Sequence, residues 1–104
     1  MRGDVHRLRA TRGARGNEQH GSRYAVILQS DDLLLSTLLV APTSRSAQPR
    51  IFRPTILISE DPTQVLTEQT AAVAPERLGE LVGHVSLTEL QAIDAALRLT
   101  LGID

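Results

Sequence analysis

The hydrophobic residues of this chain gather in short runs between polar breaks, a pattern typical of a mainly β protein. The clearest run, 23–29, has an apolar centre at 25–28 that does not alternate with polar residues, so we expect a buried strand there. A second apolar run at 37–41 is followed by Pro42, where we expect the strand to end. A short strand at 4–8 is compatible with the pattern before both.

The pattern predicts shorter elements further along the chain. We expect a third strand at 51–58, and Pro54 makes it an edge strand or a kinked one. A short fourth strand is expected at 64–67, one helical turn at 74–78 and a last strand at 81–85.

The C-terminal segment has the strongest local signals. Ser86 and Glu89, within "SLTEL", form the two halves of a capping box that begins a helix, and Gly102 is suited to end it. Asp94 and Arg98 lie four residues apart and can form an ion pair on the helix surface. One face of the helix is apolar and carries Leu90, Ile93, Leu97 and Leu101. The sequence therefore predicts a small, mainly β barrel or sheet with a C-terminal helix.

Length and composition narrow the class of protein. With 104 residues, 41% of them hydrophobic, the chain is expected to form a single domain, 1–104, and its small size favours a homodimer. It has no cysteine, no signal-peptide pattern and no apolar stretch of about 18 residues, so we expect a cytoplasmic protein without disulfides or a membrane span. Its three scattered histidines have no metal-ligand spacing, and we expect no metal and no other cofactor.

The charged residues are unevenly distributed. The net charge is −1, but residues 1–53 carry nine arginines against four acidic residues, whereas 54–104 carry two arginines against eight acidic residues. Arginine suits bidentate contact with phosphate, although a GC-rich genome would also enrich it. The first half of the chain is therefore expected to present a basic face to a nucleic acid.

Two polar loops border the predicted buried strands and form the candidate site. The loop "GNEQHGSR" (16–23) precedes the first strand and "PTSR" (42–45) follows the second, so neighbouring strands would bring the loops together. They offer side chains that can bind phosphate or move a proton: Glu18, His20, Arg23, Thr43, Ser44 and Arg45. This set fits metal-free RNA cleavage, in which the RNA 2′-hydroxyl attacks, a base takes its proton and positive charge stabilises the phosphorane.

Each of these residues also has a purely structural interpretation. Arg23 could solvate the end of its own strand, and Thr43 and Ser44 could bond to the backbone of a turn. Glu18 could pair with one of the arginines, and His20 could be a solvated loop side chain. The residue types alone leave this choice open.

The chain resembles the MazF/PemK family of toxin ribonucleases over nearly its whole length. The segments that carry the resemblance are, in chain order, "MRGDV" (1–5), "RGNEQHGSRYAVILQSD" (15–31), "LVAPTSR" (39–45) and "RLGELVGHVSLTELQAIDAALRLTLGI" (77–103). The most specific part combines the glutamate- and arginine-containing loop before a buried strand with the proline- and threonine-containing loop after the next.

This resemblance implies an SH3-like β-barrel of the CcdB/MazF/Kid kind that acts as a homodimer. It implies a type II toxin that cleaves single-stranded mRNA at specific sequences without a metal, leaves 2′,3′-cyclic phosphate and 5′-hydroxyl ends, and so inhibits translation and growth. It also implies a cognate MazE-like antitoxin, whose C-terminal segment we expect to be acidic. The family's catalytic arginine and threonine fall on Arg23 and Thr43. The family's loop glutamate falls on Glu18. Further candidates for RNA binding or support are Gln19, His20, Ser44, Arg45 and Gln69.

Three features depart from the family pattern. Tyr24 replaces the usual proline after the arginine, Ala71 stands where an arginine is usual, and the segment "VHRLRA" (5–10) lacks the usual aromatic residue. With one tyrosine and one phenylalanine in the chain, RNA binding would depend mainly on arginine and would weaken strongly with salt.

Two alternative functions stay open. The first is a catalytically weak relative that mainly binds its antitoxin and helps to repress the operon, which Tyr24 and Ala71 favour. The second is a CcdB-like poison of DNA gyrase, which would need neither Arg23 nor Thr43.

Overall fold

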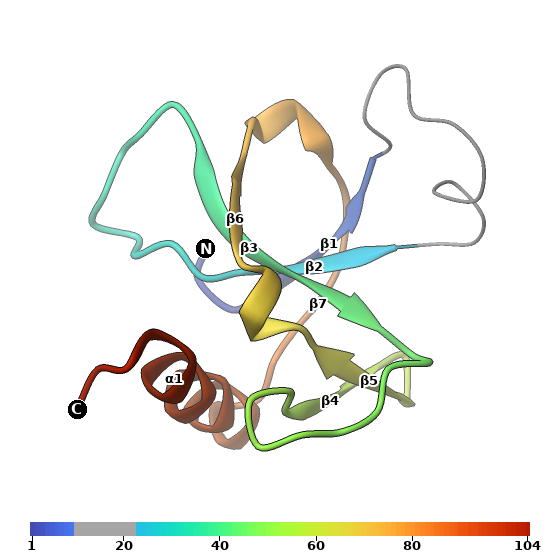
Figure 1. Cartoon of the computed structure of the whole chain (residues 1–104). Helices are drawn as coiled ribbons and strands as arrows, with labels where there is room; N and C mark the ends of the chain where they lie inside the picture. Colours follow the sequence, from blue (N-terminus) through green and yellow to red (C-terminus); the bar gives the residue numbers. More distant parts are fainter. Residues whose placement is uncertain (10–22) are drawn as a thin grey trace.

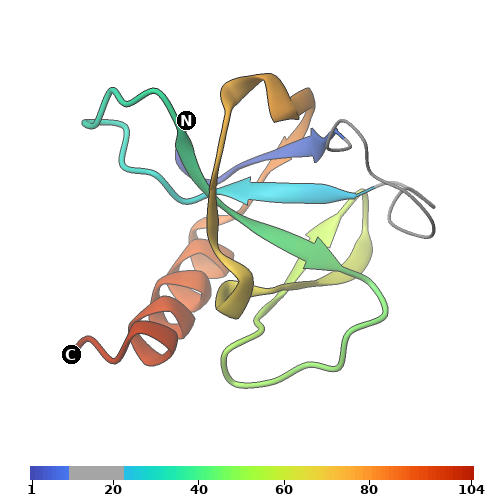
Figure 2. The ribbon, with the colours of Figure 1, turned by 45° about the horizontal axis from the view of Figure 1, so that its top comes forward.

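The described strands form one curved antiparallel sheet, and a helix lies beside it (Figures 1 and 2). The computed structural model describes residues 1–9 and 23–104. Its strands are β1 (Asp4–Leu8), β2 (Tyr24–Ile27), β3 (Leu38–Ser44), β4 (Thr55–Ile58), β5 (Asp61–Val65), β6 (Ala71–Val73) and β7 (Leu78–His84). Two 3-10 turns, η2 (Thr67–Gln69) and η3 (Pro75–Arg77), precede and follow β6, and the helix α1 (Leu87–Leu101) follows β7. The predicted mainly β fold with a C-terminal helix is confirmed.

The sheet order explains which strand is central. Within the described residues the order is β4-β5-β3-β2-β1-β7, and β6 pairs with β3 outside this path. β2 therefore has a hydrogen-bonded neighbour on each edge, β1 on one side and β3 on the other.

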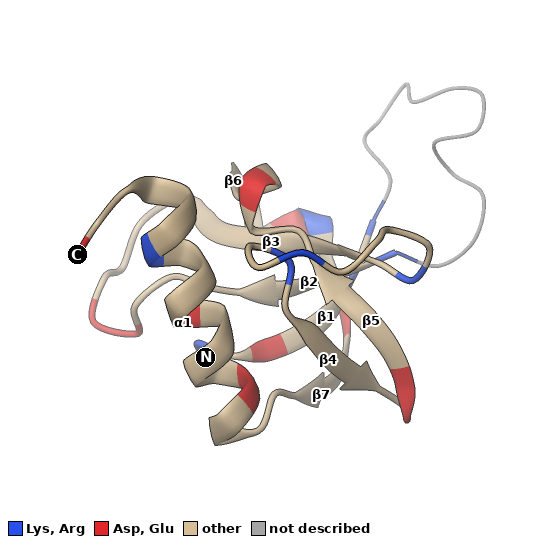
Figure 3. Cartoon of the chain, turned by 60° about the horizontal axis from the view of Figure 1, so that its bottom comes forward, with Lys and Arg blue, Asp and Glu red and all other residues tan. Residues whose placement is uncertain are grey.

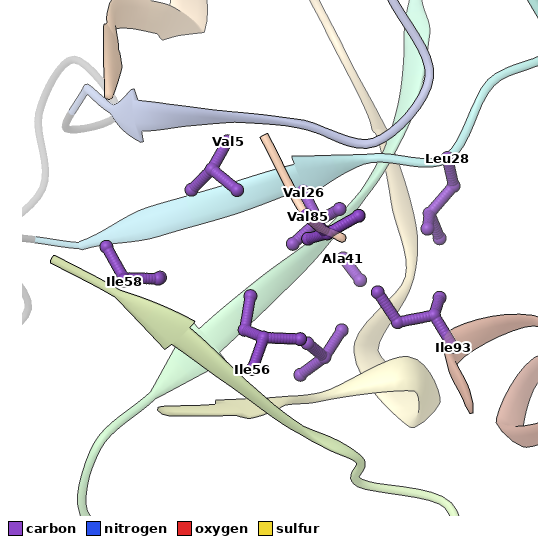
Figure 4. Close-up of a cluster of buried hydrophobic side chains, with 9 residues drawn as sticks. Val5, Val26, Leu28, Ala41, Ile56, Ile58, Val85 and Ile93 are labelled. Carbon is purple, nitrogen blue, oxygen red and sulfur yellow. The ribbon is translucent and has the colours of Figure 1, made fainter. Parts of the chain in front are cut away.

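β2 is also buried on both faces. Val26 belongs to a large core cluster with side chains from β1, β3, β4, β5 and α1 (Figure 4). Ala25 and Ile27 face the opposite way and form a second cluster with Val40 of β3. Burial on both faces explains why the run 25–28 does not alternate, and the predicted buried strand is confirmed, with Tyr24 and Ile27 as its ends.

β3 runs through Pro42, where the sequence pattern predicts its end, and continues to Ser44. That prediction is wrong because Pro42 lies where β3 changes its partner from β6 to β5, so the missing N–H interrupts no continuous ladder. The carbonyl of Pro42 still accepts a hydrogen bond from the Leu66 N–H at 2.9 Å. The expected loop 42–49 therefore begins only after Ser44.

The next two strands are displaced from their predicted positions. Only β4 forms within 51–58, because residues 50–53 make a turn that its first and last residues close, and β4 is an edge strand as expected. β5 begins before the predicted 64–67, directly after a two-residue turn in which Ser59 and Glu60 both have positive φ. Positive φ at both turn residues is the geometry of a tight hairpin.

Residues 71–84 form two elements that the sequence predicts and one that it does not. The turn predicted at 74–78 is η3, and the strand predicted at 81–85 is β7, which begins three residues earlier. β6 is not predicted by the sequence pattern, because a strand of three residues has too little periodicity and depends on its pairing with β3.

α1 has both predicted caps. The Ser86 hydroxyl accepts the Glu89 N–H at 3.1 Å, the Glu89 carboxylate accepts the Ser86 N–H at 2.8 Å, and Gly102 ends the helix at a φ of 68°. Ile93 is fully buried in the core, and the predicted apolar face is otherwise completed by the half-buried Leu90 and Leu97. Leu101 does not extend this buried face, since it is 63% exposed at the end of α1.

The predicted ion pair between Asp94 and Arg98 is replaced by a long-range one. Asp94 accepts a hydrogen bond from the guanidinium of Arg2 at 2.5 Å, and the same guanidinium donates to the Leu28 carbonyl at 2.9 Å. The backbone N–H of Arg2 also donates to the Asp31 carboxylate at 2.8 Å. Arg2 thus joins the first residues to the segment that follows β2 and to α1.

β7 is anchored to β1 by a polar pair at the edge of the sheet. His84 Nδ1 and Asp4 Oδ1 are 2.7 Å apart, and the ammonium of Met1 lies 3.2 Å from the other carboxylate oxygen. Partial burial acts to raise the pKa of Asp4, but the bonds from His84 and the ammonium outweigh it and hold the pKa below its usual value.

This depressed pKa predicts how acid destabilises the fold. Because the pKa of Asp4 is lower in the folded chain than in the unfolded one, its contribution to stability is present above the unfolded value of 3.8 and is lost as pH falls through the folded pKa. We expect Asp4→Asn to lower the free energy of unfolding at pH 7 and to flatten its decline on acidification, measured by urea denaturation at a series of pH values. The exposed Asp32, changed to Asn, is the matched control. Equal acid sensitivity of the wild type and Asp4→Asn would contradict the assignment.

Candidate functional site

Arg23 stands at the entrance of β2 with its side chain in solvent. It directly precedes Tyr24, the first residue of the strand, and it is exposed. Its carbonyl accepts the Leu8 N–H of β1 at 2.9 Å, so the sheet fixes the backbone of Arg23 although the side chain is free of the core. An exposed cation on a fixed backbone is what binding of a phosphate at a defined position requires.

The end of β3 lies beside Arg23, as the loop arrangement predicts. The register pairs Ala25 with Pro42, and the hydroxyl of the next residue, Thr43, bonds to the carbonyl of Tyr24, which directly follows Arg23. Ser44 pairs with Gln64 of β5. The structure therefore brings Arg23, Thr43 and Ser44 together at one end of the sheet.

The two hydroxyls at the end of β3 have different surroundings. Thr43 is only 5% exposed, and its hydroxyl donates to the Tyr24 carbonyl at 3.1 Å. Ser44 is half-buried, and its hydroxyl oxygen accepts the N–H groups of Ser46 and Ala47 at 3.2 and 3.0 Å. The hydroxyl oxygens of Ser44 and Ser46 are 3.3 Å apart.

Arg45 is a second exposed cation at the same end. Its guanidinium lies 3.0 Å from the carboxylate of Asp61, and both side chains are well exposed. Exposed ion pairs contribute at most about 1 kcal/mol. A phosphate could therefore take the place of Asp61 at little cost.

Gln69 does not lie with these residues. The Leu66 N–H bonds to the Pro42 carbonyl, so the chain beyond Val65 runs along β3 away from Ser44. η2 carries Gln69, which is exposed, and packs against β3 and α1. A role of Gln69 in RNA binding stays a prediction, as do the roles of Glu18, Gln19 and His20, which lie outside the described residues.

Arg7 is a neighbour of the site that the sequence analysis does not single out. It pairs with Tyr24 across β1 and β2, and its guanidinium carbon lies 5.4 Å from the centre of the tyrosine ring. It also lies 3.6 Å from the Glu80 carboxylate. The signal that could have found it is the alternation along 4–8, which puts Arg7 on the same face as the buried Val5.

Glu68, next to Gln69 in η2, forms an ion pair with Arg53. Arg53 donates to one oxygen of its carboxylate, from Nε at 2.8 Å and from an amino nitrogen at 2.5 Å. These bonds lower the pKa of Glu68 below its usual value. The position where the family pattern has an arginine, Ala71, is exposed at the start of β6.

The charge asymmetry of the sequence is only partly kept in space, because Arg2, Arg45 and Arg53 each pair with an acidic residue of the second half of the chain. Basic segments mark the end of β1 and the start of β2, whereas α1 carries two acidic residues and one arginine (Figure 3). Within 1–9 and 23–104, no three histidine or acidic side chains gather closely enough to hold a metal ion. No described helix has the length and apolar character to cross a membrane.

Comparison with known sequences identifies relatives over nearly the whole chain. Residues 1–101 match a family described as PemK-like, MazF-like toxins of type II toxin–antitoxin systems. The Mycobacterium tuberculosis protein Rv3098A, named as a candidate toxin, is 32% identical over 104 residues, which cover 99% of this chain and 98% of that protein.

Solved structures share the fold at low sequence identity. The Mycobacterium tuberculosis toxin MazF-mt6 aligns with a TM-score of 0.78 at 16% identity, over 97% of this chain and 98% of that one. MazF from Deinococcus radiodurans aligns with a TM-score of 0.76 at 20% identity, over 98% and 96%. A mycobacterial endoribonuclease in complex with its cognate antitoxin aligns with a TM-score of 0.79 at 14% identity, over 100% and 96%. These similarities confirm the predicted barrel type.

Proposed function

We propose that this chain, which belongs to the PemK-like, MazF-like family of type II toxin–antitoxin toxins, is an endoribonuclease that cleaves single-stranded mRNA at specific sequences. The observation that carries the proposal is the exposed Arg23 on a fixed backbone beside the hydroxyl-bearing end of β3. A cation and a hydroxyl held together at a strand end can recognise one phosphate of an RNA chain. Cleavage of mRNA in the cytoplasm would inhibit translation and growth.

The proposed reaction uses the nucleophile that RNA itself carries. The 2′-oxygen forms a bond to phosphorus while the bond from phosphorus to the 5′-oxygen breaks, which leaves a 2′,3′-cyclic phosphate and a 5′-hydroxyl. The 2′-hydroxyl gives its proton to a base, for which Glu18 and His20 are the sequence candidates, and the departing 5′-oxygen takes up a proton from a second acidic group or from water. The guanidinium of Arg23 would stabilise the negative charge that develops on the phosphorane oxygens.

The proposed partners follow from the same charged end of the sheet. An antitoxin with an acidic C-terminal segment would neutralise the arginines that otherwise bind RNA, and Arg23 and Arg45 would be its main contacts. A homodimer would place two such ends in one assembly. The mycobacterial endoribonuclease that shares the fold has been solved with its cognate antitoxin, which supports a partner of this kind.

The proposal predicts cleavage that survives EDTA. Arg23 supplies the positive charge and RNA supplies the nucleophile, so no step of the proposed reaction needs a divalent ion. Purified protein is incubated with a long single-stranded RNA in EDTA and the ends are mapped, with a magnesium-dependent nuclease as the control. We expect 5′-hydroxyl ends at recurrent short sequences. Activity that EDTA abolishes and Mg²⁺ restores would contradict the mechanism.

Arg23→Ala is expected to abolish cleavage in a folded protein. Loss of a positioned group that stabilises the transition-state charge costs on the order of 3–4 kcal/mol, by analogy with an oxyanion-hole donor. Cleavage rates and circular dichroism are measured together, because the exposed side chain contributes little to the core. Arg98→Ala, at an exposed position of α1, is the matched control and should cleave normally. Unchanged cleavage by Arg23→Ala would remove Arg23 from the site.

RNA and the antitoxin segment are expected to exclude each other. A non-cleavable RNA analogue is titrated into a complex of the protein with an acidic peptide from the antitoxin tail. We expect displacement in both directions and weaker binding of both partners as salt rises, because both use the same arginines. A stable ternary complex at low salt would show that the antitoxin inhibits from a different surface.

A further inference from the structure

We infer that the guanidinium of Arg7, held over the ring of Tyr24, binds a phosphate of the RNA chain other than the one bound by Arg23. This inference rests on the proposed function and adds an RNA-binding residue to the same site. The loop pattern of the sequence places no site residue on β1, so the assignment depends on the strand register and the side-chain contacts of the structure.

Arg7 lies close to the start of β2. It is the register partner of Tyr24 across β1 and β2, and the N–H of the next residue, Leu8, bonds to the carbonyl of Arg23 at 2.9 Å. From the opposite strand, β3, the hydroxyl of Thr43 bonds to the Tyr24 carbonyl at 3.1 Å. Arg7 and Thr43 therefore approach Tyr24 from its two sides, at the same end of the sheet as Arg23.

Arg7 and Tyr24 lie on the same face of the sheet, because they are directly opposite one another in an antiparallel pair. Val5 and Val26, two residues away on each strand, are another such pair, and both belong to the large core cluster. Tyr24 packs against that cluster, whereas the side chain of Arg7 is 45% exposed. Arg7 thus lies where the core meets solvent, within reach of an RNA phosphate.

The tyrosine ring restricts the position of this guanidinium. Its central carbon lies 5.4 Å from the centre of the ring, which is within the range of a cation–π contact. A free arginine side chain would lose its rotamer freedom when it binds a phosphate, and this loss weakens binding. Because the contact with Tyr24 already orders Arg7, part of that cost falls on the folded protein and not on RNA binding.

The carboxylate near Arg7 can give way to a phosphate. The Nε atom of Arg7 lies 3.6 Å from Glu80, beyond hydrogen-bond distance, and the two side chains are 45% and 70% exposed. An exposed pair of this kind contributes at most about 1 kcal/mol. A phosphate can instead form two parallel hydrogen bonds with a guanidinium, which are stronger and more specific in geometry. RNA would therefore displace Glu80 at little cost.

The inference connects two departures from the family pattern. Tyr24 stands in place of a proline and supplies the ring, and Arg7 supplies the cation within the segment 5–10, which lacks the usual aromatic residue. A proline at position 24 would have no aromatic ring to hold a guanidinium. The two positions therefore act as a unit in this chain.

The test measures how RNA affinity depends on salt in the full-length protein. The probe is a single-stranded RNA with the sequence that the wild type cleaves and one 2′-deoxynucleotide at the cleavage position. We expect Arg7→Gln to bind it about tenfold more weakly at low salt, because a charge-assisted hydrogen bond is lost. The slope of log affinity against log salt should fall in magnitude by about 0.7, the value for one phosphate of a single strand.

Two variants control for charge and for the fold. Arg98→Gln, at an exposed position of α1, changes the net charge equally and should leave the slope unchanged. Arg7→Lys keeps the charge and should restore the slope. Thermal melting of each variant shows whether it is folded.

Two further variants test the contacts around Arg7. Glu80→Gln removes the competing carboxylate and should strengthen binding of the same probe about threefold, whereas the exposed Asp32, changed to Asn, should alter it less. Tyr24→Leu keeps an apolar side chain against the core but removes the ring. It should weaken binding about threefold in the wild type and leave binding by Arg7→Gln unchanged, because the ring acts through Arg7.

The outcomes separate this inference from the proposed function. If the wild type cleaves RNA and folded Arg7→Gln binds the probe with unchanged affinity and slope, the inference alone is overturned. Weaker binding with an unchanged slope would also overturn it, since Arg7 would then contact a base or act through the fold. Should Arg7→Gln not fold, Glu80→Gln decides, because an unchanged affinity there overturns the inference. A wild type that neither binds nor cleaves single-stranded RNA overturns the proposed function, and the inference with it.

Discussion

The position of β2 between β1 and β3 is the constraint on which the other elements depend. Both faces of β2 are apolar, so its own side chains do not distinguish one register from the next, as they would in a strand with one polar face. Side-chain hydrogen bonds at the two ends of β2 fix its register with β3 instead. Thr43 holds the Tyr24 carbonyl at one end, and at the other the side-chain oxygen of the buried Gln29 accepts the Leu39 N–H at 3.3 Å. A shift by one residue would break both bonds and leave buried polar atoms unpaired, at about 1–3 kcal/mol each.

The sequence predicts best the elements whose signals are local. The caps of α1, Ser86 and Gly102, lie within the segment they bound, and the helix is found where they predict it. β6 and the continuation of β3 past Pro42 depend on strands that lie elsewhere in the chain, so no local pattern reveals them. The bond between Arg2 and Asp94 joins residues far apart in the sequence, and helix periodicity alone favours the incorrect partner Arg98.

For the candidate site too, some features can be predicted from local sequence and others depend on how distant strands pair. The residue types of the loops predict that Arg23 and the segment 42–45 meet, because neighbouring strands bring their ends together. Which of the two adjacent hydroxyls faces the core depends on the register between β2 and β3, and a shift of one residue would exchange them. Thr43 and Ser44 are adjacent in the sequence, whereas in the structure Thr43 is buried and donates to the Tyr24 carbonyl, and Ser44 is half-buried and accepts the Ala47 N–H.

Tyr24 is the departure from the family pattern that most concerns the site, since a proline at that position would restrict the backbone after Arg23. In this chain three contacts restrict the same backbone. The Leu8 N–H holds the Arg23 carbonyl and Thr43 holds the Tyr24 carbonyl, while the guanidinium of Arg7 covers the tyrosine ring. These contacts come from β1 and β3. The neighbouring strands therefore restrict the backbone at the start of β2, as the ring of a proline at position 24 would do. The substitution of tyrosine for proline therefore leaves Arg23 on a fixed backbone, which weakens the argument that this chain is a catalytically impaired relative.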